Sequence, residues 1–294
     1  MKRFSKMLEM FIIFVGLVVI LSCSNQSQDF SSNLVYDFSS DGEPIDVIIL
    51  AGQSNATGCC FSEDLREYVS PEDFELFTNG FENQKIIWYL DWSNHSLPSI
   101  SCELTNVKLG QGFSDVGFGP EIGISYVMNK INKKCVIIKY SSPGSGIDTF
   151  LSSNDLNKAF EFFIANSLCE ISKKGYSPEI KCICWMQGET DSCYEQEAGL
   201  YEKRETTLIS AFRRHFGTDI AFIDARITDW FLVMPNCYQE VVNKAKVNIS
   251  RSQANNYIIN SNGLTKLEDL MHYNAKSQFE LGKRFGEMIL SKCY

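Results

Sequence analysis

The sequence contains only three histidines, His95, His215 and His272, and they lie far apart along its 294 residues. It has eleven cysteines, yet no two of them form a Cys-x-x-Cys pair. Structural zinc sites are usually built from closely spaced cysteines and histidines, and this pattern is missing. The sequence therefore gives no support for a metal site, and we expect none.

The chain also lacks an excess of positive charge. Its 27 Lys and Arg residues stand against 36 Asp and Glu residues, for a formal net charge of -9. A protein that follows nucleic-acid phosphates carries the opposite sign, so we expect no nucleic-acid partner. Hydrophobic residues make up 44% of the chain, enough for one substantial core, and one folded domain is the simplest expectation.

The apolar run over residues 10–21 is too short for an ordinary membrane span, which needs about 20 residues. Three basic residues precede it and Cys23 follows closely, which is the layout of an export signal. The last four residues, Ile-Leu-Ser-Cys over 20–23, resemble a bacterial lipoprotein box. We expect a signal peptide over 1–22 and export to the periplasm or cell surface, with a lipid on Cys23 that anchors the protein to a membrane. An ordinary cleaved signal or an uncleaved anchor are the alternatives.

Residues 23–44 are rich in Ser, Asn, Gln and Asp and cannot form a core, so we expect a flexible tether there and a folded domain over 45–294. Ten cysteines follow Cys23, and an exported compartment permits disulfides among them. Cys182 and Cys184 lie in an apolar, strand-like run, where we expect buried free thiols.

After the tether, short apolar runs alternate with longer amphipathic stretches, which is the pattern of a parallel sheet covered by helices. The predicted strands are Asp46–Leu50, Cys135–Tyr140, Lys181–Met186, Ile220–Ala225 and Tyr257–Ile259. The predicted helices are Pro120–Asn129, Leu156–Lys173, Glu195–Phe216, Gln239–Asn248 and Asn274–Ser291. These elements predict an α/β fold, a three-layer α/β/α sandwich with a mainly parallel five-stranded sheet.

Polar motifs follow four of the predicted strands. They are Gly52-Gln53-Ser54-Asn55, Pro143-Gly144-Ser145-Gly146, Gln187-Gly188-Glu189-Thr190-Asp191 and Asp269-Leu270-Met271-His272. In open α/β sheets, ligands bind beyond the carboxyl ends of the strands. We therefore expect these four motifs to converge at one end of the sheet.

A serine hydroxyl becomes a good nucleophile when a base takes its proton and a third group orients that base. His272 has Asp269 three residues before it, a spacing that lets the two side chains meet. His215 ends a predicted helix, where a cation is common, and His95 lies in an irregular segment. Ser54 alone could simply cap a helix. The joint occurrence of Ser54, Asp269 and His272 at strand ends favours catalysis.

Together these motifs resemble the signature blocks of the SGNH-type hydrolases. The resemblance is carried by Gly52-Gln53-Ser54-Asn55, Gly119-Pro120-Glu121, Trp185-x-Gln187-Gly188-Glu189-x-Asp191 and Asp269-x-x-His272. It spans roughly residues 45–290 and is strongest for the carbohydrate esterases that include sialate O-acetylesterases and acetyl xylan esterases. It implies a flavodoxin-like SGNH hydrolase fold, with Ser54 as nucleophile, His272 as base and Asp269 as the acid that orients it.

The same resemblance implies an oxyanion hole made by the backbone N–H groups of Ser54 and Gly144 and the side-chain amide of Gln187. Pro143-Gly144-Ser145 stands where these relatives usually have a Gly-Gly-Thr-like turn. Four further residues match family positions and are expected to support the site: Asn55, Glu121, Glu189 and Asp191. No metal or organic cofactor is implied.

We therefore expect a serine esterase that removes O-acetyl groups from carbohydrates, either sialic acid or a plant polysaccharide such as xylan. A general short-chain carboxylesterase and a catalytically silent, glycan-binding surface lipoprotein are the alternatives. The segment from Thr57 to Phe118 is long and irregular and contains Trp88, Tyr89 and Trp92. Its aromatic residues could form a wall that stacks on a sugar, although packing over the edge of the sheet is the simpler explanation.

Overall fold

The structure is a computed structural model that describes residues 41–91, 103–228 and 237–294. All of these belong to one compact unit, residues 35–294. The predicted signal peptide, Cys23 and most of the tether lie outside the described residues, and so do His95 and Cys102. Within the described ranges, no helix combines the length and apolar character needed to cross a bilayer.

A seven-stranded sheet forms the centre of the described fold, in the order β11-β10-β9-β1-β6-β3-β4. Every neighbouring pair is parallel except β3 and β4, which are antiparallel. In chain order the strands are β1 (Glu43–Gly52), β3 (Gln84–Leu90), β4 (Thr105–Asn106), β6 (Cys135–Ser141), β9 (Tyr176–Met186), β10 (Ala221–Ala225) and β11 (Asn256–Ile259).

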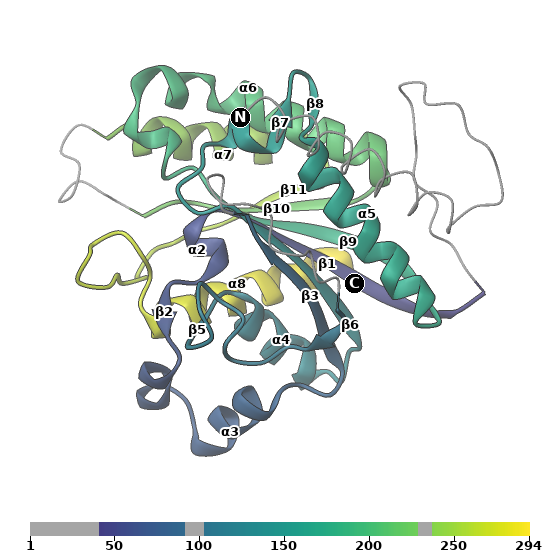
Figure 1. Ribbon diagram of the computed structural model, residues 1–294. Coiled ribbons are helices and arrows are strands. Elements are labelled where there is room, and N and C mark those ends of the chain that lie inside the picture. Colours follow the sequence, from purple (N-terminus) through teal and green to yellow (C-terminus); the bar gives the residue numbers. More distant parts are fainter. Residues whose placement is uncertain (1–40, 92–102, 229–236) are drawn as a thin grey trace, which may run out of the picture. The chain divides into compact units, whose positions relative to one another are not determined.

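Helices cover both faces of this sheet (Figure 1). On one side lie α5 (Lys158–Lys173), α6 (Glu195–Phe216) and α7 (Gln239–Ser252), and on the other lie α3 (Pro71–Asn79), α4 (Glu121–Lys130) and α8 (Ala275–Cys293). Since both faces are covered, the middle strands carry nearly unbroken apolar runs, and all seven residues of β6 are buried. The predicted three-layer α/β/α sandwich is confirmed.

Local sequence signals explain where several helices begin and end. The Ser70 side chain caps α3, whose first residue is Pro71, and the Asn274 side chain accepts a hydrogen bond of 3.0 Å from the Ser277 N–H at the start of α8. Gly217 follows Phe216, the last residue of α6, and the helix ends where the sequence predicts. The Asn274 cap matters for the site, because it fixes the chain directly after His272.

The sheet holds two more strands than the five predicted, β3 and β4. β3 falls in the segment that looked irregular, and two of the aromatic residues noted there, Trp88 and Tyr89, belong to it. Tyr89 is 8% exposed, and its ring packs 5.6 Å from those of Tyr140 and Phe163. The simpler explanation therefore holds for Tyr89, which is part of the core. Trp92 lies outside the described residues.

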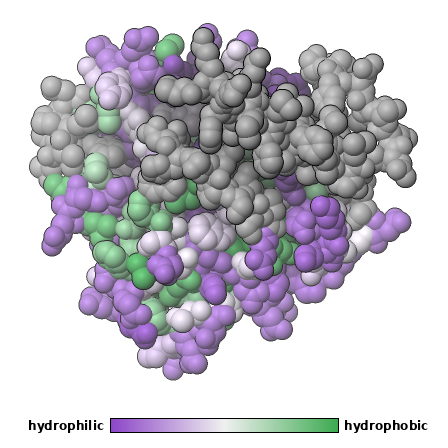
Figure 2. Space-filling view, viewed as in Figure 1, coloured by the Kyte–Doolittle hydropathy of each residue, from purple (hydrophilic) through white to green (hydrophobic). Residues whose placement is uncertain are grey.

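The remaining elements are short. They are α2 (Ser54–Thr57), β2 (Cys60–Phe61), β5 (Gly117–Phe118), β7 (Leu151–Ser152), β8 (Asp155–Leu156) and the 3-10 turns η1 (Glu63–Glu67), η2 (Ile147–Phe150) and η3 (Asp191–Cys193). Figure 2 shows hydrophilic and hydrophobic residues interspersed on the lower part of this face of the molecule. The nine cysteines of the described residues are free thiols, and Cys182 and Cys184 are fully buried, as expected.

Candidate active site

The four polar motifs follow the carboxyl ends of β1, β6, β9 and β11, as predicted. Because these strands are parallel members of one sheet, their carboxyl ends lie along the same edge (Figure 1). Hydrogen bonds join the motifs: the Gln53 side chain bonds to the segment after β9, and the Asn55 side chain bonds to the segment after β11. The motifs therefore form one cluster rather than four separate turns.

Ser54 opens a helix of only four residues directly after β1. The turn that leads to it requires glycine at position 52, where φ is +143° and a Cβ atom would lie 1.9 Å from the Met186 carbonyl oxygen. The Gln53 N–H donates to that same carbonyl at 3.0 Å. This close contact between β1 and β9 turns the chain sharply and places Ser54, which is 8% exposed, at the edge of the sheet.

Asp269 and His272 form a direct pair, with 2.7 Å between Asp269 Oδ2 and His272 Nδ1. The other carboxylate oxygen of Asp269 accepts the backbone N–H groups of Met271 at 2.8 Å and His272 at 3.0 Å. Burial alone would raise the pKa of Asp269, but these bonds to its ionised form outweigh burial and lower the pKa. An ionised Asp269 holds the proton of His272 on Nδ1, which leaves Nε2 as an acceptor.

Asn55 connects the helix that carries Ser54 to the segment that carries His272. Its Oδ1 accepts the Tyr273 N–H at 3.0 Å, and its backbone carbonyl accepts the Gln278 side-chain amide at 3.1 Å. Its Nδ2 donates to Glu189 Oε1 at 2.7 Å. Asn55 is 2% exposed, so these bonds form away from water and fix the position of the His272 segment against α2.

Glu189 and Asp191 are almost fully buried, at 2% and 1% exposure. Burial raises the pKa of both carboxyl groups, against the hydrogen bonds that they accept. Asp191 accepts the Ile147 N–H at 3.0 Å and the Gln187 amide at 2.6 Å. Asp191 therefore holds neighbouring segments together. Glu189 has one bonded oxygen, Oε1, and one buried oxygen, Oε2, that has no partner among the described residues.

Gln187 lies in a different environment from the one expected. Its Nε2 has three acceptors, Asp191 Oδ2 at 2.6 Å, the Ser145 carbonyl at 3.2 Å and Gln53 Oε1 at 3.3 Å, while the Tyr201 hydroxyl donates to its Oε1 at 2.9 Å. An amide nitrogen has only two hydrogens, and Gln187 is 0% exposed. In this structure Gln187 therefore has no donor left for an oxyanion, contrary to the sequence expectation.

Gly144 lies in the turn after β6, with φ of +72°. A Cβ atom at this position would have no neighbour within 4 Å, so glycine serves the backbone conformation rather than a close contact. The adjacent Ser145 is tied to Ser142 through their hydroxyls at 2.8 Å and to Gln187 through its carbonyl. The turn that carries Gly144 is thus fixed from both sides.

Glu121 lies beneath α2 in a buried ion pair with Lys139, at 2.8 Å. The Lys139 ammonium also donates to the carbonyls of Thr57 at 2.8 Å and Gln111 at 2.7 Å, and Glu121 accepts the Gly119 N–H at 2.8 Å. All three hydrogens of the ammonium have partners. Glu121 therefore supports the helix that carries Ser54 and lies too deep to reach a substrate, since its exposure is 0%.

The Cys59 thiol lies close to Ser54, with its Sγ 3.6 Å from the Ser54 carbonyl oxygen. Burial and the charge of Asp269 raise the pKa of this thiol to about 12. Cys59 is therefore protonated at neutral pH and does not compete with Ser54 as a nucleophile.

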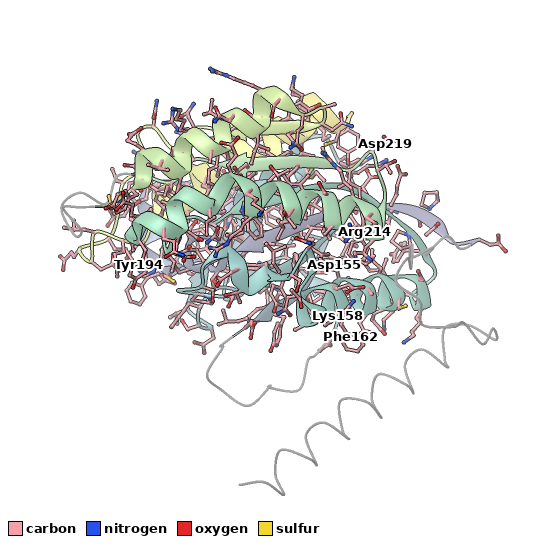
Figure 3. The ribbon with its side chains drawn as sticks, turned by 90° about the horizontal axis from the view of Figure 1, so that it is seen from above. Asp155, Lys158, Phe162, Tyr194, Arg214 and Asp219 are labelled. Carbon is pink, nitrogen blue, oxygen red and sulfur yellow. The ribbon has the colours of Figure 1, made fainter. Side chains whose placement is uncertain are left out.

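His215 is engaged elsewhere, with its Nε2 2.6 Å from Asp155 Oδ1 and its Nδ1 3.6 Å from Glu161. Figure 3 shows Asp155 next to Arg214 of α6, and this ion pair measures 2.8 Å. The cluster joins α6 to the β7–β8 hairpin. Of the two described histidines, His272 is therefore the one that lies with its acid partner at the edge of the sheet where the motifs meet.

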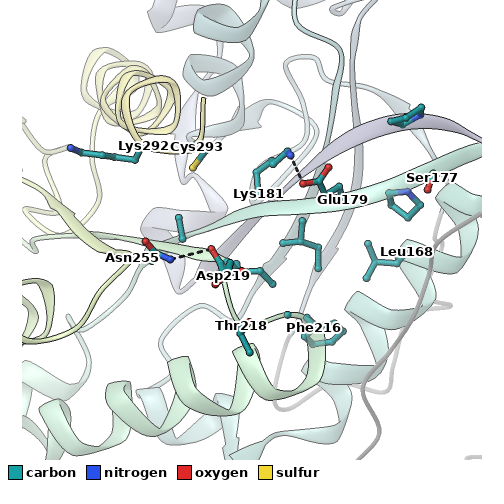
Figure 4. A pocket seen from close by; sticks show the side chains of 16 residues that line it. Leu168, Ser177, Glu179, Lys181, Phe216, Thr218, Asp219, Asn255, Lys292 and Cys293 are labelled. Carbon is teal, nitrogen blue, oxygen red and sulfur yellow. Dashed lines mark hydrogen bonds and ion pairs between the residues drawn. The ribbon is translucent and has the colours of Figure 1, made fainter.

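A cavity of about 910 Å³ lies elsewhere among the described residues. Glu179 and Lys181 of β9 line it together with Asp219, which precedes β10 (Figure 4). It lies toward the amino ends of these strands, and none of the predicted site residues lines it. Within the described ranges, no group of three or more potential ligands could hold a metal ion.

Sequence reasoning missed the polar residues buried behind the site. Lys246 is 0% side-chain exposed and lies 2.6 Å from Asp224 and 3.9 Å from Glu205. Glu205 Oε1 lies 3.3 Å from the hydroxyl of Tyr201, which in turn donates to Gln187. A signal was present, because Glu205 falls four residues after Tyr201 on the apolar stripe of a predicted helix, where a charge is unusual.

Comparison with known families matches residues 44–291 to a family model described as "Carbohydrate esterase, sialic acid-specific acetylesterase". No curated protein matches the chain. Solved structures similar to it include a protein of Arabidopsis thaliana at 18% identity, with a TM-score of 0.63 and coverage of 85% of this chain and 100% of that one.

Two further structures are similar over 85% of this chain. NanS is 13% identical, with 98% of its chain covered and a TM-score of 0.57. A carbohydrate acetylesterase from Xanthomonas citri is 11% identical, with 57% of its chain covered and a TM-score of 0.59. At these identities the likeness shows a shared fold.

Proposed function

Because the chain belongs to the carbohydrate esterase family of sialic acid-specific acetylesterases, we propose that it hydrolyses an O-acetyl ester on a sugar through an acyl intermediate on Ser54. The observation that carries the proposal is the Asp269–His272 pair, held against the Ser54 helix by Asn55. In this arrangement a nucleophile, a base and an orienting acid come from two distant parts of the chain.

In the acylation step, Ser54 Oγ attacks the acetyl carbonyl carbon while His272 Nε2 takes the hydroxyl proton. The tetrahedral intermediate collapses when the bond to the sugar oxygen breaks, and His272 returns the proton to that oxygen. In deacylation, His272 takes a proton from water, whose oxygen attacks the acetyl carbon. The bond from that carbon to Ser54 Oγ then breaks, His272 returns the proton to Oγ, and acetate leaves. Asp269 stays ionised throughout and stabilises the imidazolium, which agrees with its lowered pKa.

The backbone N–H groups of Ser54 and Gly144 are proposed donors for the negative charge on the tetrahedral intermediate. Donors placed in advance at this position lower the barrier because they need no rearrangement when the charge forms. The bonds of Ser145 to Ser142 and Gln187 support this role for the Gly144 turn, since they hold the turn in place before substrate arrives.

For the sugar itself, two exposed aromatic side chains are candidates: Phe61, which follows α2 in β2, and Phe113, which lies in the segment before β5. Phe61 is 58% and Phe113 is 45% exposed, and the Phe113 N–H donates to the Gly58 carbonyl at 2.9 Å, close to the end of α2. We propose that these rings contact the apolar face of the sugar, because aromatic rings combine large contact area with defined geometry. Replacing each ring with alanine should raise KM more than it lowers kcat.

Labelling with a fluorophosphonate, which reacts with activated serines, tests the proposal. We expect one labelled peptide that contains Ser54, and loss of the label in Ser54→Ala and His272→Ala. A folded wild-type protein that stays unlabelled would instead support the silent, glycan-binding alternative.

The substrate class is tested by acetate release from O-acetylated sialic acid, acetylated xylan and acetylated pectin. We propose that sialic acid esters are hydrolysed fastest, in line with the description of the family. Turnover of all three at rates no higher than that of a simple aryl acetate would favour the general carboxylesterase alternative.

We also propose that residues 1–22 direct export and that Cys23 carries a lipid, on the basis of the basic and apolar segments in the sequence. Metabolic labelling with a fatty acid in a bacterial host should mark the wild-type protein but not Cys23→Ser. Equal labelling of both proteins would argue against lipidation at Cys23.

A further inference from the structure

Gln53, the residue before Ser54, has its side chain turned toward the segment after β9. Its Oε1 accepts the backbone N–H groups of Thr190 at 3.2 Å and Gly188 at 3.4 Å, and the Gln187 amide at 3.3 Å. A backbone N–H can only donate, so these bonds identify which end of the amide is the oxygen. The side chain is therefore fixed with its Nε2 on the opposite side from three known donors.

The Nε2 of Gln53 has no acceptor among the described residues, although Gln53 as a whole is only 3% exposed. This nitrogen is also not one of the described polar atoms that are both fully buried and without a partner, so it keeps some solvent-accessible surface. Gln187 shows the opposite pattern, because its two amide hydrogens are shared among three acceptors, which are Asp191, Ser145 and Gln53. Of the two glutamines at this edge of the sheet, Gln53 is the one whose amide keeps a donor for a ligand.

We propose that the Gln53 side-chain amide donates a hydrogen bond to the oxyanion formed during ester hydrolysis, and that Gln187 positions Gln53. The inference rests on the proposed function of Ser54. Gln53 is bonded directly to Ser54 in the chain, so the Ser54 N–H and the Gln53 amide are carried by the same rigid turn. The Gln53 amide oxygen accepts two backbone N–H groups and shares a hydrogen of Gln187, so the donor is held in place before substrate arrives, as preorganisation requires.

Gln53 and Gln187, the two glutamines of the sequence motifs, therefore have different roles. Gln187 bonds to Gln53, Ser145 and Asp191, which come from the segments after β1, β6 and β9. It acts as a positioning residue that holds the three segments together. Gln53 then contacts the reacting oxygen and counts as a catalytic residue.

The substitution Gln53→Glu tests the proposal most sharply. A carboxylate keeps an oxygen acceptor for the Gly188 and Thr190 N–H groups, but it has no hydrogen to donate at neutral pH. With 4-nitrophenyl acetate as substrate, kcat should fall about 100- to 1,000-fold, the typical effect of losing one oxyanion donor, while KM stays within about threefold. The melting temperature should fall, because the new carboxylate is almost fully buried, so kcat is compared per folded molecule.

Because glutamate adds charge as well as removing a donor, Gln53→Met serves as the second variant. It lacks both the charge and the donor, and it should show a similar loss of kcat per folded molecule even if it unfolds at lower temperature. The folded fraction is measured by circular dichroism. A folded Gln53→Met or Gln53→Glu enzyme with kcat within about threefold of the wild type would overturn the assignment.

Ser54→Ala is measured in parallel to separate this inference from the proposed function. If Ser54→Ala is inactive and the Gln53 variants keep their kcat, the assignment of Gln53 is wrong and the proposed esterase mechanism stands. If Ser54→Ala keeps its activity, the proposed function itself fails and the role of Gln53 fails with it.

Discussion

Asn55 Oδ1 accepts a 3.0 Å hydrogen bond from the backbone N–H of Tyr273, a residue 218 positions further along the chain. The bond joins the residue after Ser54 to the residue after His272. The distance between the proposed nucleophile and base therefore depends on Asn55 rather than on either functional residue alone.

Asn55→Ala should lower kcat about 10- to 100-fold, because a displacement of the His272 segment by about 1 Å can cost on the order of 100-fold in rate. The same change leaves Glu189 without its 2.7 Å partner, so the melting temperature should fall as well. Steady-state kinetics and thermal unfolding measure the two effects. Unchanged kcat in the folded variant would show that Asn55 does not position His272.

The two described histidines give a matched pair of variants. His272→Ala should reduce acetate release at least 1,000-fold and change stability little, because its imidazole is 23% exposed and, among the described residues, bonds only to Asp269. His215→Ala should lower the melting temperature and keep kcat, because His215 is 5% exposed and holds Asp155. The opposite outcome for the two variants would move the base to His215.

The variant Gln187→Ala distinguishes the role of oxyanion donor, expected from the sequence, from the structural role that the hydrogen bonds of Gln187 indicate. As an oxyanion donor, Gln187 would account for about 100- to 1,000-fold in kcat. In the structure it holds three segments together, so its loss should lower the melting temperature by several degrees and reduce kcat of the folded fraction less than about tenfold. A large fall in kcat without a change in melting temperature would restore the original expectation.

The buried Lys246 cluster predicts a pH dependence of stability. Burial raises the pKa of Asp224 to about 6, and burial and the charge of Asp224 raise the pKa of Glu205. Two carboxyl groups share one ammonium, so the pair retains a proton that the unfolded chain loses near pH 4. The stability that this proton confers is fully present below about pH 4 and is lost as the pH rises through 6 and above.

Glu205→Gln tests this dependence, because an amide resembles the protonated carboxyl group and leaves one carboxylate for one ammonium. The melting temperature of the wild type should fall relative to that of Glu205→Gln as the pH rises from 5 to 8. Melting curves that stay parallel over this range would show that the cluster does not titrate there.

The position of the site could be predicted from the sequence because each motif follows an apolar run, and parallel strands bring such motifs to one edge. The hydrogen-bond partners of each side chain could not be predicted from the sequence. Gln187 contacts Gln53 across 134 residues, and Asn55 contacts Glu189 across the same separation. Which amide of a cluster stays free for a ligand depends on these distant bonds, so the family pattern alone pointed to Gln187.

Strand β3 was not predicted from the sequence for a different reason. Its half-buried positions include Lys85 and Trp88, and it belongs to a long connection in the sequence. Its short apolar run therefore resembled a loop with scattered aromatic residues. Pairing with β6 decides its conformation, because every residue from Gln84 to Leu90 aligns with a residue of β6. Tertiary contacts of this kind outweigh local propensity in strands.

The central claim is that Ser54 is the nucleophile of an acetylesterase, and acetate release by Ser54→Ala tests it most directly. The hydroxyl is small and lies at the edge of the sheet, so the variant should fold with a melting temperature close to that of the wild type. Acetate release from O-acetylated sialic acid should fall by a factor on the order of a million, to the residual rate left when a triad member is removed. A folded Ser54→Ala protein that releases acetate at a rate near that of the wild type would contradict the account.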